Sequence, residues 1–325
     1  MFADDMVLQI FMIVLGLAVL LIAGDLLVRG AVGLATAFKI PALVVSLTIV
    51  AFGTSAPELF VSVQAVLAGE SGIAIGNIIG SNIANVLLVL GLPAIIYPVS
   101  AHVVGLRRHG VIMLLATAVF AGFAYATNII GQTAGLILIA GIVFYVVFMW
   151  VGAVRGAIDD PVISDAAEYA ESAGLSAKTV LFLVAGLAGL PFGANLLVDH
   201  GGALATDLGV RHELVGLTIV AFGTSLPELA TVMAAALHRK SDVAIGGIVG
   251  SNIFNIFAVG GAAGLAGTSY FTPTALVLDI PVMIASALLI CFAIFTKRDI
   301  GRLSGAAMLL AYIGFIVAVA ATAGA

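Results

Sequence analysis

The feature that most constrains this chain is a segment that occurs twice, each time inside apolar sequence long enough to cross a bilayer. Residues 47–59 read LTIVAFGTSAPEL and residues 217–229 read LTIVAFGTSLPEL, so the copies differ at one position and lie 170 residues apart. Each copy holds one glutamate, Glu58 or Glu228, directly after a proline. An ionised carboxylate inside a membrane costs at least ~2.5 kcal/mol, so the fold must give both glutamates partners or polar surroundings.

Composition identifies the broad class of protein. Of the 325 residues, 62% are hydrophobic and 9% are charged, and the mean hydropathy is +1.27, so there is too little charge to cover a water-soluble globule. We therefore expect an all-α polytopic protein in a lipid bilayer. The sequence has no basic cluster of the kind that binds nucleic acid, and its single cysteine, Cys291, excludes an intrachain disulfide. The opening MFADDMVLQ lacks the basic region of a cleavable signal, so we expect the first apolar run to be retained.

Ten apolar segments, each near the ~20 residues that a membrane helix needs, follow one another along the chain. Five precede the loop at 155–178 and five follow it, so we divide the chain into a first five-helix repeat (1–154), a linker loop (155–178) and a second five-helix repeat (179–325). Because five is odd, the second repeat must enter the membrane from the opposite side, which predicts ten transmembrane helices in two inverted-topology repeats. The expected segments are 7–28, 41–68, 71–97, 109–127, 130–154, 179–206, 212–237, 242–268, 273–296 and 303–322.

A second pair of segments repeats at the same offset. Residues 73–86 read IAIGNIIGSNIANV and residues 243–256 read VAIGGIVGSNIFNI. In both copies a serine and an asparagine lie four positions apart, which places them on one face of a helix. Asn77 has a glycine, Gly247, as its counterpart, and we interpret it as a packing residue. The repeated polar pairs are Ser81 with Asn85 and Ser251 with Asn255.

The distribution of Lys and Arg predicts the orientation. With the N-terminus outside, eleven of the twelve basic residues fall on one side and only Arg211 on the other, a bias that identifies the first side as cytoplasmic. Both termini are then expected outside a plasma or inner membrane, with the 155–178 loop in the cytoplasm. The acids of that loop lack EF-hand spacing, so we prefer a solvated linker to the alternative, a regulatory calcium site.

The residues around the two glutamates point to a cation as their partner, because neither copy of the motif offers a Lys or Arg. Pro57 and Pro227 lack an N–H and their rings open the preceding turn, which frees backbone carbonyls. These carbonyls and the hydroxyls and amides of the repeated motifs are all oxygen donors. Such a set suits Na⁺ and Ca²⁺, whereas without His or Cys it does not suit zinc, copper or iron. The alternative interpretation of Glu58 and Glu228 is a structural pair of carboxylates held by serine hydroxyls.

GTSAPE and GSNIAN in the first half, with GTSLPE and GSNIFN in the second, resemble the paired alpha repeats of the cation/calcium exchanger superfamily, specifically its sodium/calcium exchanger branch. The resemblance covers essentially the whole chain. It implies an antiporter in which Na⁺ moving down its gradient drives Ca²⁺ through a midplane site that opens to one side at a time. It also implies that Glu58 and Glu228 hold Ca²⁺ and that segments 7–28 and 179–206 are the mobile pair. The ligands carried over by motif match are Ala51, Thr54, Ser55, Glu58, Ser81, Asn85, Ala221, Thr224, Ser225, Glu228, Ser251 and Asn255.

One departure leaves the counter-ion open. Some sodium/calcium exchangers carry an aspartate where this chain has Asn255, although two acids are enough to neutralise one Ca²⁺. A Ca²⁺/H⁺ or K⁺-dependent antiporter on the same fold is the nearest alternative, and a cation channel is a less favoured one. An intramembrane hydrolase is disfavoured because Ser55 and Glu58 have no histidine near them in sequence. We expect no enzymatic activity, no cofactor beyond the transported Ca²⁺ and Na⁺, and no obligatory protein partner.

Other charged residues are expected to serve the membrane surface. Asp25 lies four residues before Arg29, a spacing that predicts an ion pair on the surface of a helix. The histidines fall near the predicted ends of segments, where we expect interfacial solvation. These histidines are His102, His109, His200, His212 and His238.

Overall fold

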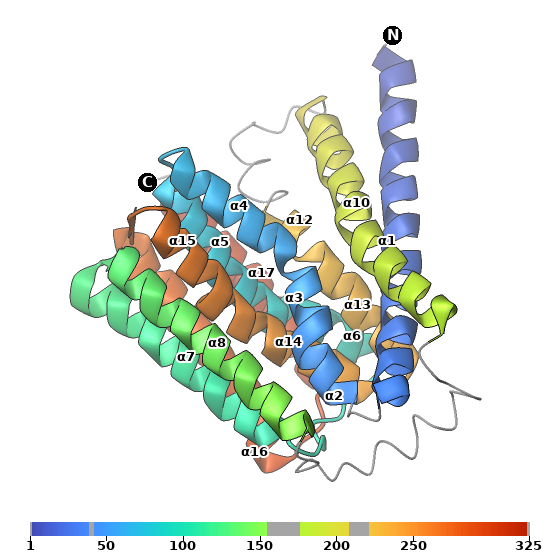
Figure 1. The fold of residues 1–325 in the computed structure, drawn as a ribbon. Helices are drawn as coiled ribbons and strands as arrows, with labels where there is room; N and C mark the ends of the chain where they lie inside the picture. The colour runs from blue at the N-terminus through green and yellow to red at the C-terminus, as the bar shows by residue number, and fades with distance from the viewer. Residues whose placement is uncertain (1, 39–41, 155–175, 208–220, 324–325) are drawn as a thin grey trace.

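The computed structural model describes residues 2–38, 42–154, 176–207 and 221–323, and these residues form a helical bundle with one two-stranded sheet (Figure 1). Within them, eight helices are long and apolar enough to cross a membrane, or nine if one bent pair is counted as a single span. The chain is therefore a mostly helical, polytopic membrane protein. The expected segment 212–237 lies partly outside the described residues, as does most of the expected 155–178 loop.

The helices of the two halves fall at matching places. In the first half they are α1 (Phe2–Phe38), α2 (Ala42–Val45), the π-helical turn η1 (Ser46–Val50), α3 (Ala51–Thr54), α4 (Ala56–Leu67), α5 (Ser71–Ala84), the π-helical turn η2 (Asn85–Leu90), α6 (Gly91–Ile96), α7 (Leu106–Thr127) and α8 (Gln132–Val154). In the second half they are α10 (Ala177–Asp207), α12 (Ala221–Thr224), α13 (Leu226–Leu237), α14 (Ser241–Phe254), the π-helical turns η4 (Asn255–Val259) and η5 (Ala275–Asp279), α15 (Gly260–Ala266), α16 (Ile280–Thr296) and α17 (Arg302–Ala323). Most helix boundaries recur at the offset of 170 that the sequence repeat predicts.

The repeated motif breaks its helix where the proline chemistry predicts. α3 ends at Thr54, Ser55 leaves helical geometry with φ −84° and ψ 4°, and α4 begins at Ala56 with Pro57 in its first turn. The two parts of this span are bent by 47°. Ser225 repeats the break with φ −86° and ψ 1° between α12 and α13. Because proline supplies no N–H and its ring crowds the preceding turn, both spans break just before their glutamates.

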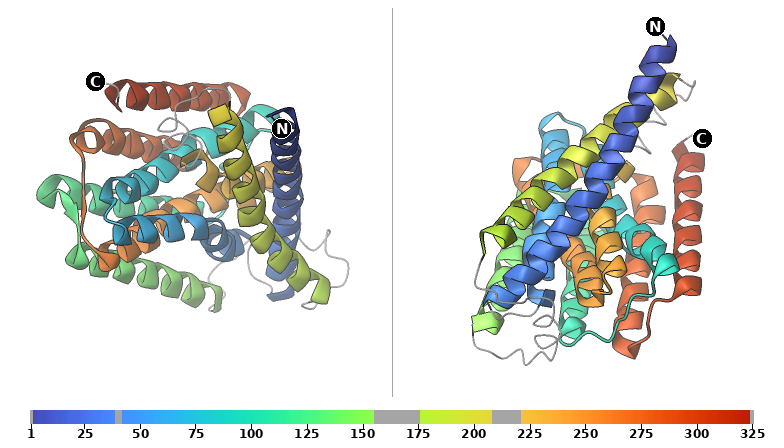
Figure 2. Two further views of the ribbon diagram at one scale, coloured as in Figure 1. Left: turned by 90° about the horizontal axis from the view of Figure 1, so that it is seen from above. Right: turned by 90° about the vertical axis from the view of Figure 1, so that its right-hand side faces the viewer.

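α1 and α10 form a tilted pair that lies across one side of the bundle (Figures 1 and 2). Glycines of α10 let the two helices approach at backbone distance. A Cβ at Gly186 would lie 2.7 Å from Cβ and 2.8 Å from Cα of Leu27, and a Cβ at Gly193 would lie 2.9 Å from the carbonyl oxygen of Gly16. α1 also contacts α13, since a Cβ at Gly24 would lie 2.7 Å from the carbonyl oxygen of Ala230. Small residues at such contacts are typical of helix packing in membranes.

The loops that join the later helices pair across the two halves. At one end of the bundle Val99 pairs with Ile300, and at the other Ile130 of β1 (Ile129–Ile130) pairs with Ser269 of β2 (Ser269–Tyr270). Moving Val99 forward by the repeat offset of 170 gives Ser269, and moving Ile300 back by the same offset gives Ile130. The two pairings are therefore copies of each other with the halves exchanged.

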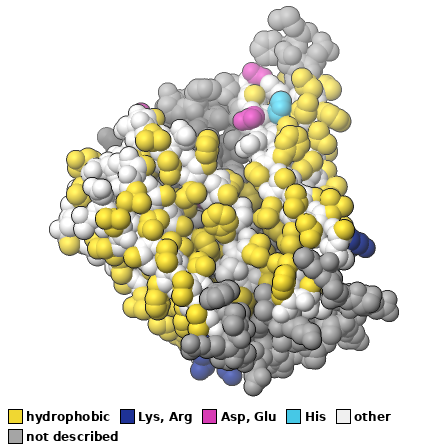
Figure 3. All heavy atoms as spheres, viewed as in Figure 1, with side chains coloured by type: hydrophobic (Ala, Val, Ile, Leu, Met, Phe, Trp, Pro, Cys, Tyr) yellow, Lys and Arg dark blue, Asp and Glu magenta, His cyan; other side chains and the backbone are white. Residues whose placement is uncertain are grey.

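Basic segments gather at the end of the bundle that holds Val99. Arg239 stacks over the ring of Tyr97 at 5.5 Å, Arg107 donates to the carbonyl oxygen of Phe295 at 2.7 Å, and Ser241 accepts from the backbone of Ser100 at 3.0 Å. On the face drawn in Figure 3, the visible Lys and Arg atoms lie in the lower half, and hydrophobic side chains are spread widely over the described surface. Both chain ends lie toward the upper end in Figure 1.

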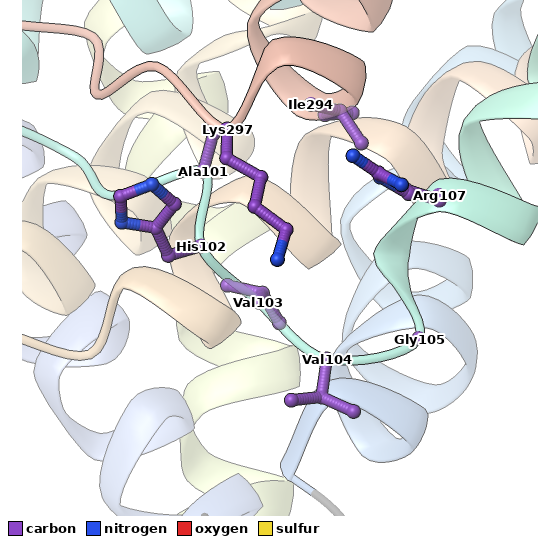
Figure 4. Close-up of a pocket in the computed structure, with 8 residues that line it drawn as sticks. All are labelled: Ala101, His102, Val103, Val104, Gly105, Arg107, Ile294 and Lys297. Atoms are coloured by element: carbon purple, nitrogen blue, oxygen red, sulfur yellow. The ribbon is translucent and has the colours of Figure 1, made fainter.

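A cavity of about 450 Å³ opens at this basic end (Figure 4). No residue of the repeated motifs lines it. Its lining is Ala101, His102, Val103, Val104, Gly105, Arg107, Ile294 and Lys297.

Two expectations for charged residues have different outcomes. The ion pair between Asp25 and Arg29 is confirmed, with an N–O distance of 2.8 Å, and His238 contacts the same carboxylate. The prediction that His109 is solvated at the membrane interface is wrong. α7 begins three residues earlier than predicted, so His109 is only 1% exposed and its Nδ1 lies 3.4 Å from the Tyr145 hydroxyl.

We predict that Gly186→Ala destabilises the protein, because its new methyl group overlaps the backbone of Leu27 and forces α1 away from α10. Overpacking of this kind typically costs ~1–3 kcal/mol, which is measurable as a lower melting temperature of the purified protein in detergent. Gly122→Ala is the matched control, because no described atom lies within 4 Å of its Cβ position. Equal melting temperatures for the two variants would contradict the close α1–α10 contact.

Candidate cation site

The two repeated glutamates are buried in the interior of the bundle. Glu58 is 0% exposed and Glu228 is 2% exposed, and the two carboxylates lie close enough to interact electrostatically. Each lies in the first turn of its helix, α4 or α13, where the helix dipole favours a negative charge. Neither glutamate makes an ion pair with a described Lys, Arg or His. Two buried carboxyl groups therefore interact with each other, and no described basic side chain pairs with either of them.

Hydroxyl and amide groups join the two halves around these acids. The Ser55 hydroxyl donates to Oε1 of Glu228 at 3.2 Å, and the hydroxyls of Thr54 and Ser251 are 3.4 Å apart. Every one of these contacts crosses from the first half to the second. The tertiary structure thus brings together, in pairs, residues of the matched motifs that lie 173 and 197 positions apart in the chain.

A second set of contacts lies where α5 crosses α14. The Asn255 amide donates to the Ser81 hydroxyl at 3.0 Å, and the Asn85 amide donates to Oδ1 of Asn252 at 3.0 Å. Asn85 and Asn255 are each 0% exposed, and each is the first residue of a π-helical turn, η2 or η4. Such π-helical turns often occur at functional sites.

Many buried oxygens of the repeated motifs lack a hydrogen-bond partner within the part of the chain that the structure describes. Native proteins rarely leave buried polar atoms unpaired, so a group of them indicates a missing ligand or ordered water. All of these atoms are oxygens, which is the donor type that Na⁺ and Ca²⁺ prefer. They are both carboxylate oxygens of Glu58, Oε2 of Glu228, Oγ of Ser225, and Oδ1 of Asn82, Asn85 and Asn255.

The remaining predicted ligands differ in their surroundings. Ala51 is buried at the start of α3, and its carbonyl oxygen accepts from the Ser55 N–H at 3.0 Å, so it is less free than the sequence suggested. Ala221 begins α12, but its side chain lies outside the described residues. The Thr224 hydroxyl donates to Oδ1 of Asn77 at 3.4 Å and does not repeat the contact between Thr54 and Ser251.

Close packing of α14 against the first broken span brings the two halves together here. A Cβ at Gly250 would lie 2.9 Å from Cα of Leu47, so only glycine permits this approach. The Ser46 hydroxyl donates to the carbonyl oxygen of Val243 at 2.8 Å and adds a polar contact to the same interface.

Three asparagines of the site were not selected from the sequence as ligands. Asn82 and Asn252 are equivalent members of the repeated GSN motif and are each 2% exposed, so their duplication was a signal that could have identified them. Asn77 was expected to serve packing and instead makes several polar contacts. Its counterpart is a glycine, so the repeat offered no signal for it.

The described side chains of the candidate site are of the oxygen-donor type that hard cations prefer. Among the described residues no group of three or more His, Cys, Asp and Glu side chains converges, and the acids named here are Glu58 and Glu228. Two carboxylates surrounded by neutral oxygens balance one divalent cation, or two monovalent ones.

Comparisons with known proteins agree with this chemistry. The model of the family described as sodium/calcium exchanger protein matches residues 8–151 and 178–321. The sodium/calcium exchanger MaX1 of Methanosarcina acetivorans is 32% identical over 340 residues, which cover 94% of this chain and 96% of that protein. The Ca(2+)/H(+) antiporter ChaA of Bacillus subtilis is 28% identical over 279 residues, which cover 80% of this chain and 78% of that protein.

A solved structure of the sodium-calcium exchanger NCX_Mj has the same fold. It matches with a TM-score of 0.82 at 30% identity, over 96% of this chain and 99% of that chain. Because the family match spans both halves and the relatives match nearly end to end, the chain belongs to the sodium/calcium exchanger family, whose members are membrane transporters and not enzymes.

Proposed function

We propose that this protein is a secondary antiporter that exchanges Na⁺ for Ca²⁺ across the membrane. The observation that carries the proposal is the group of buried oxygens without partners around Glu58 and Glu228. The names of MaX1 and NCX_Mj support the choice of ions. No cofactor takes part, because the cations are the substrates.

The two glutamates hold Ca²⁺ in this proposal. Their charges balance one Ca²⁺ ion, and removal of the ion leaves two like charges buried together, a costly state that Na⁺ ions relieve. The hydroxyl and amide oxygens from both halves, with the carbonyls of the two alanines, provide neighbouring positions for Na⁺. Those flanking groups belong to Ala51, Thr54, Ser55, Ser81, Asn85, Ala221, Thr224, Ser225, Ser251 and Asn255.

Ten transmembrane helices in two inverted repeats provide alternating access. The family model matches twice at the repeat offset, and the exchanged loop pairings at Val99 and Ser269 fall at opposite ends of the bundle, as an inverted repeat requires. The site then lies at the midplane between the repeats. α1 and α10, which pack on each other through glycine, slide across the other helices and expose the site to one side at a time.

The basic end of the bundle faces the cytoplasm of a bacterial or archaeal cell, and both termini lie outside. This orientation follows the positive-inside rule. Arg239 stacks over Tyr97, and Arg107 donates to the carbonyl oxygen of Phe295, which supports one basic end for these loops.

Exchange of Ca²⁺ for H⁺ is the alternative. The similarity to ChaA favours it, and Asn255, at a position where some sodium/calcium exchangers carry an aspartate, leaves the counter-ion open. In that case protons on Glu58 and Glu228 replace Na⁺ as the counter-ion.

We expect Na⁺-loaded liposomes containing the protein to take up radioactive calcium after dilution into Na⁺-free buffer. Glu58→Gln and Glu228→Gln should each reduce uptake at least about 100-fold, because one carboxylate leaves a divalent charge half compensated. Uptake that follows an imposed pH gradient and ignores Na⁺ would establish the alternative counter-ion. Full uptake by either glutamine variant would contradict the two-carboxylate site.

Asn255→Asp adds a third carboxylate beside Ser81. We expect calcium uptake by this variant to fall more steeply than that of the wild type as pH is lowered, because the added acid binds protons in competition with cations. The measurement is the pH profile of initial uptake rates in liposomes. Superimposable profiles would show that position 255 does not set proton competition.

Labelling from one side tests the orientation. In a Cys291→Ala background, Thr272→Cys places a thiol in the exposed loop near β2, and His102→Cys places one in the exposed loop at the basic end. α7, with 22 residues spanning about 33 Å, separates these ends. A membrane-impermeant maleimide added to intact cells should label the first variant and not the second, and the reverse result would invert the topology.

A further inference from the structure

Asn77 is a polar residue of the repeated segments whose counterpart in the second half, Gly247, has no side chain. It lies on α5 and is half-buried. Its amide donates to the carbonyl oxygen of Glu58 at 3.1 Å and to the Ser62 hydroxyl at 2.9 Å, and its Oδ1 accepts from the Thr224 hydroxyl at 3.4 Å. One side chain therefore joins three elements, α5, α4 and α12.

The groups that Asn77 holds adjoin the oxygens that lack partners. Glu58, whose backbone carbonyl accepts from Asn77, has two side-chain oxygens without a partner among the described residues. Thr224 directly precedes Ser225, whose hydroxyl also has no partner among the described residues. Both groups lie next to a helix break, Glu58 in the first turn of α4 and Thr224 at the end of α12. A contact that fixes these breaks also fixes the direction of the carboxylate and of the serine hydroxyl.

The second half has different residues at the positions equivalent to Asn77 and Ser46. Gly247, the counterpart of Asn77, has no side chain, and a Cβ there would lie 3.5 Å from the Ser46 hydroxyl. In the sequence, the counterpart of Ser46 is Gly216. The first half therefore has polar residues at both of these positions, and the second half has glycine at both.

This asymmetry extends into the site. Thr54 lies 3.4 Å from Ser251, whereas Thr224 donates to Asn77, and the Ser81 hydroxyl accepts from Asn255. Glu228 is bound by Ser55, while neither oxygen of Glu58 has a partner within the described chain. The two glutamates are therefore not equivalent.

We infer that Asn77 is a positioning residue for the cation site, which orients Glu58 and the Thr224–Ser225 turn without contacting the cation itself. This inference rests on the proposed function. It predicts that Asn77 sets the concentration of Ca²⁺ needed for half-maximal binding and transport more than it sets the maximal rate, because a misdirected ligand weakens binding of the ion in every cycle.

The test uses Asn77→Ala in two assays. The first is equilibrium binding of radioactive calcium to the purified protein in Na⁺-free detergent, and the second is the calcium dependence of uptake into Na⁺-loaded liposomes. We expect the half-saturating concentration to rise about fivefold or more in both, the size of effect that loss of such hydrogen bonds produces, with the maximal uptake rate within about twofold of wild type. Gly247→Ala is the matched control at the equivalent position, where an added Cβ makes only ordinary contact, and it should leave both quantities unchanged.

Several results would overturn the inference. If Asn77→Ala leaves the half-saturating calcium concentration unchanged, with or without a lower maximal rate, Asn77 is a packing residue only. If Gly247→Ala changes the half-saturating concentration as much as Asn77→Ala does, the two halves do not differ at this position. If Asn77→Ala does not yield a monodisperse protein, Asn77→Ser replaces it, since the shorter hydroxyl side chain cannot reach all three partners and should also raise the half-saturating concentration. Wild-type protein that binds calcium but does not exchange it for Na⁺ would reject the proposed counter-ion alone, because the binding assay still tests Asn77.

Discussion

Two carboxylates buried inside an apolar helix bundle are the constraint on which the rest of the structure depends. Glu58 and Glu228 are nearly inaccessible, they interact with each other, and no described basic side chain pairs with them. In surroundings of low polarity, such a pair is stable only with positive charge between its members or with protons on its oxygens. The oxygens without partners around them are the kind of ligand that a dehydrated cation requires, and in the proposed function a cation supplies that positive charge.

The broken helices follow from the same requirement. A continuous helix satisfies its own backbone and offers no main-chain groups to an ion, whereas Pro57 and Pro227 interrupt it directly before each acid. The broken backbone is tolerable in a membrane because other helices cover it. Gly250 allows α14 to pack at backbone distance against the first broken span. The close helix packing that glycine allows therefore covers the backbone that the proline breaks expose.

The two halves have nearly the same motifs, so a contact that one half makes and the other does not shows where equivalent residues differ. The duplicated motifs supply matching acids, serines and asparagines, yet Ser55 binds Glu228 while Ser225 makes no corresponding contact among the described residues. Asn77 accounts for part of this difference, since it engages one threonine and one backbone carbonyl on its side only. An exchanger that handles ions of different charge at neighbouring positions benefits from such inequivalence, because identical positions would not distinguish the ions.

The sequence by itself determined the features that depend on local chemistry and on the repeat. Apolar length predicted helical spans, proline predicted the breaks at Ser55 and Ser225, and duplication selected both acids with most of the polar residues that surround them. Tertiary structure decided which groups meet, since hydroxyls and amides pair across about 170 residues and no local pattern encodes those pairings. For the same reason the burial of His109 against Tyr145 and the bridging contacts of Asn77 emerged only from the packed helices.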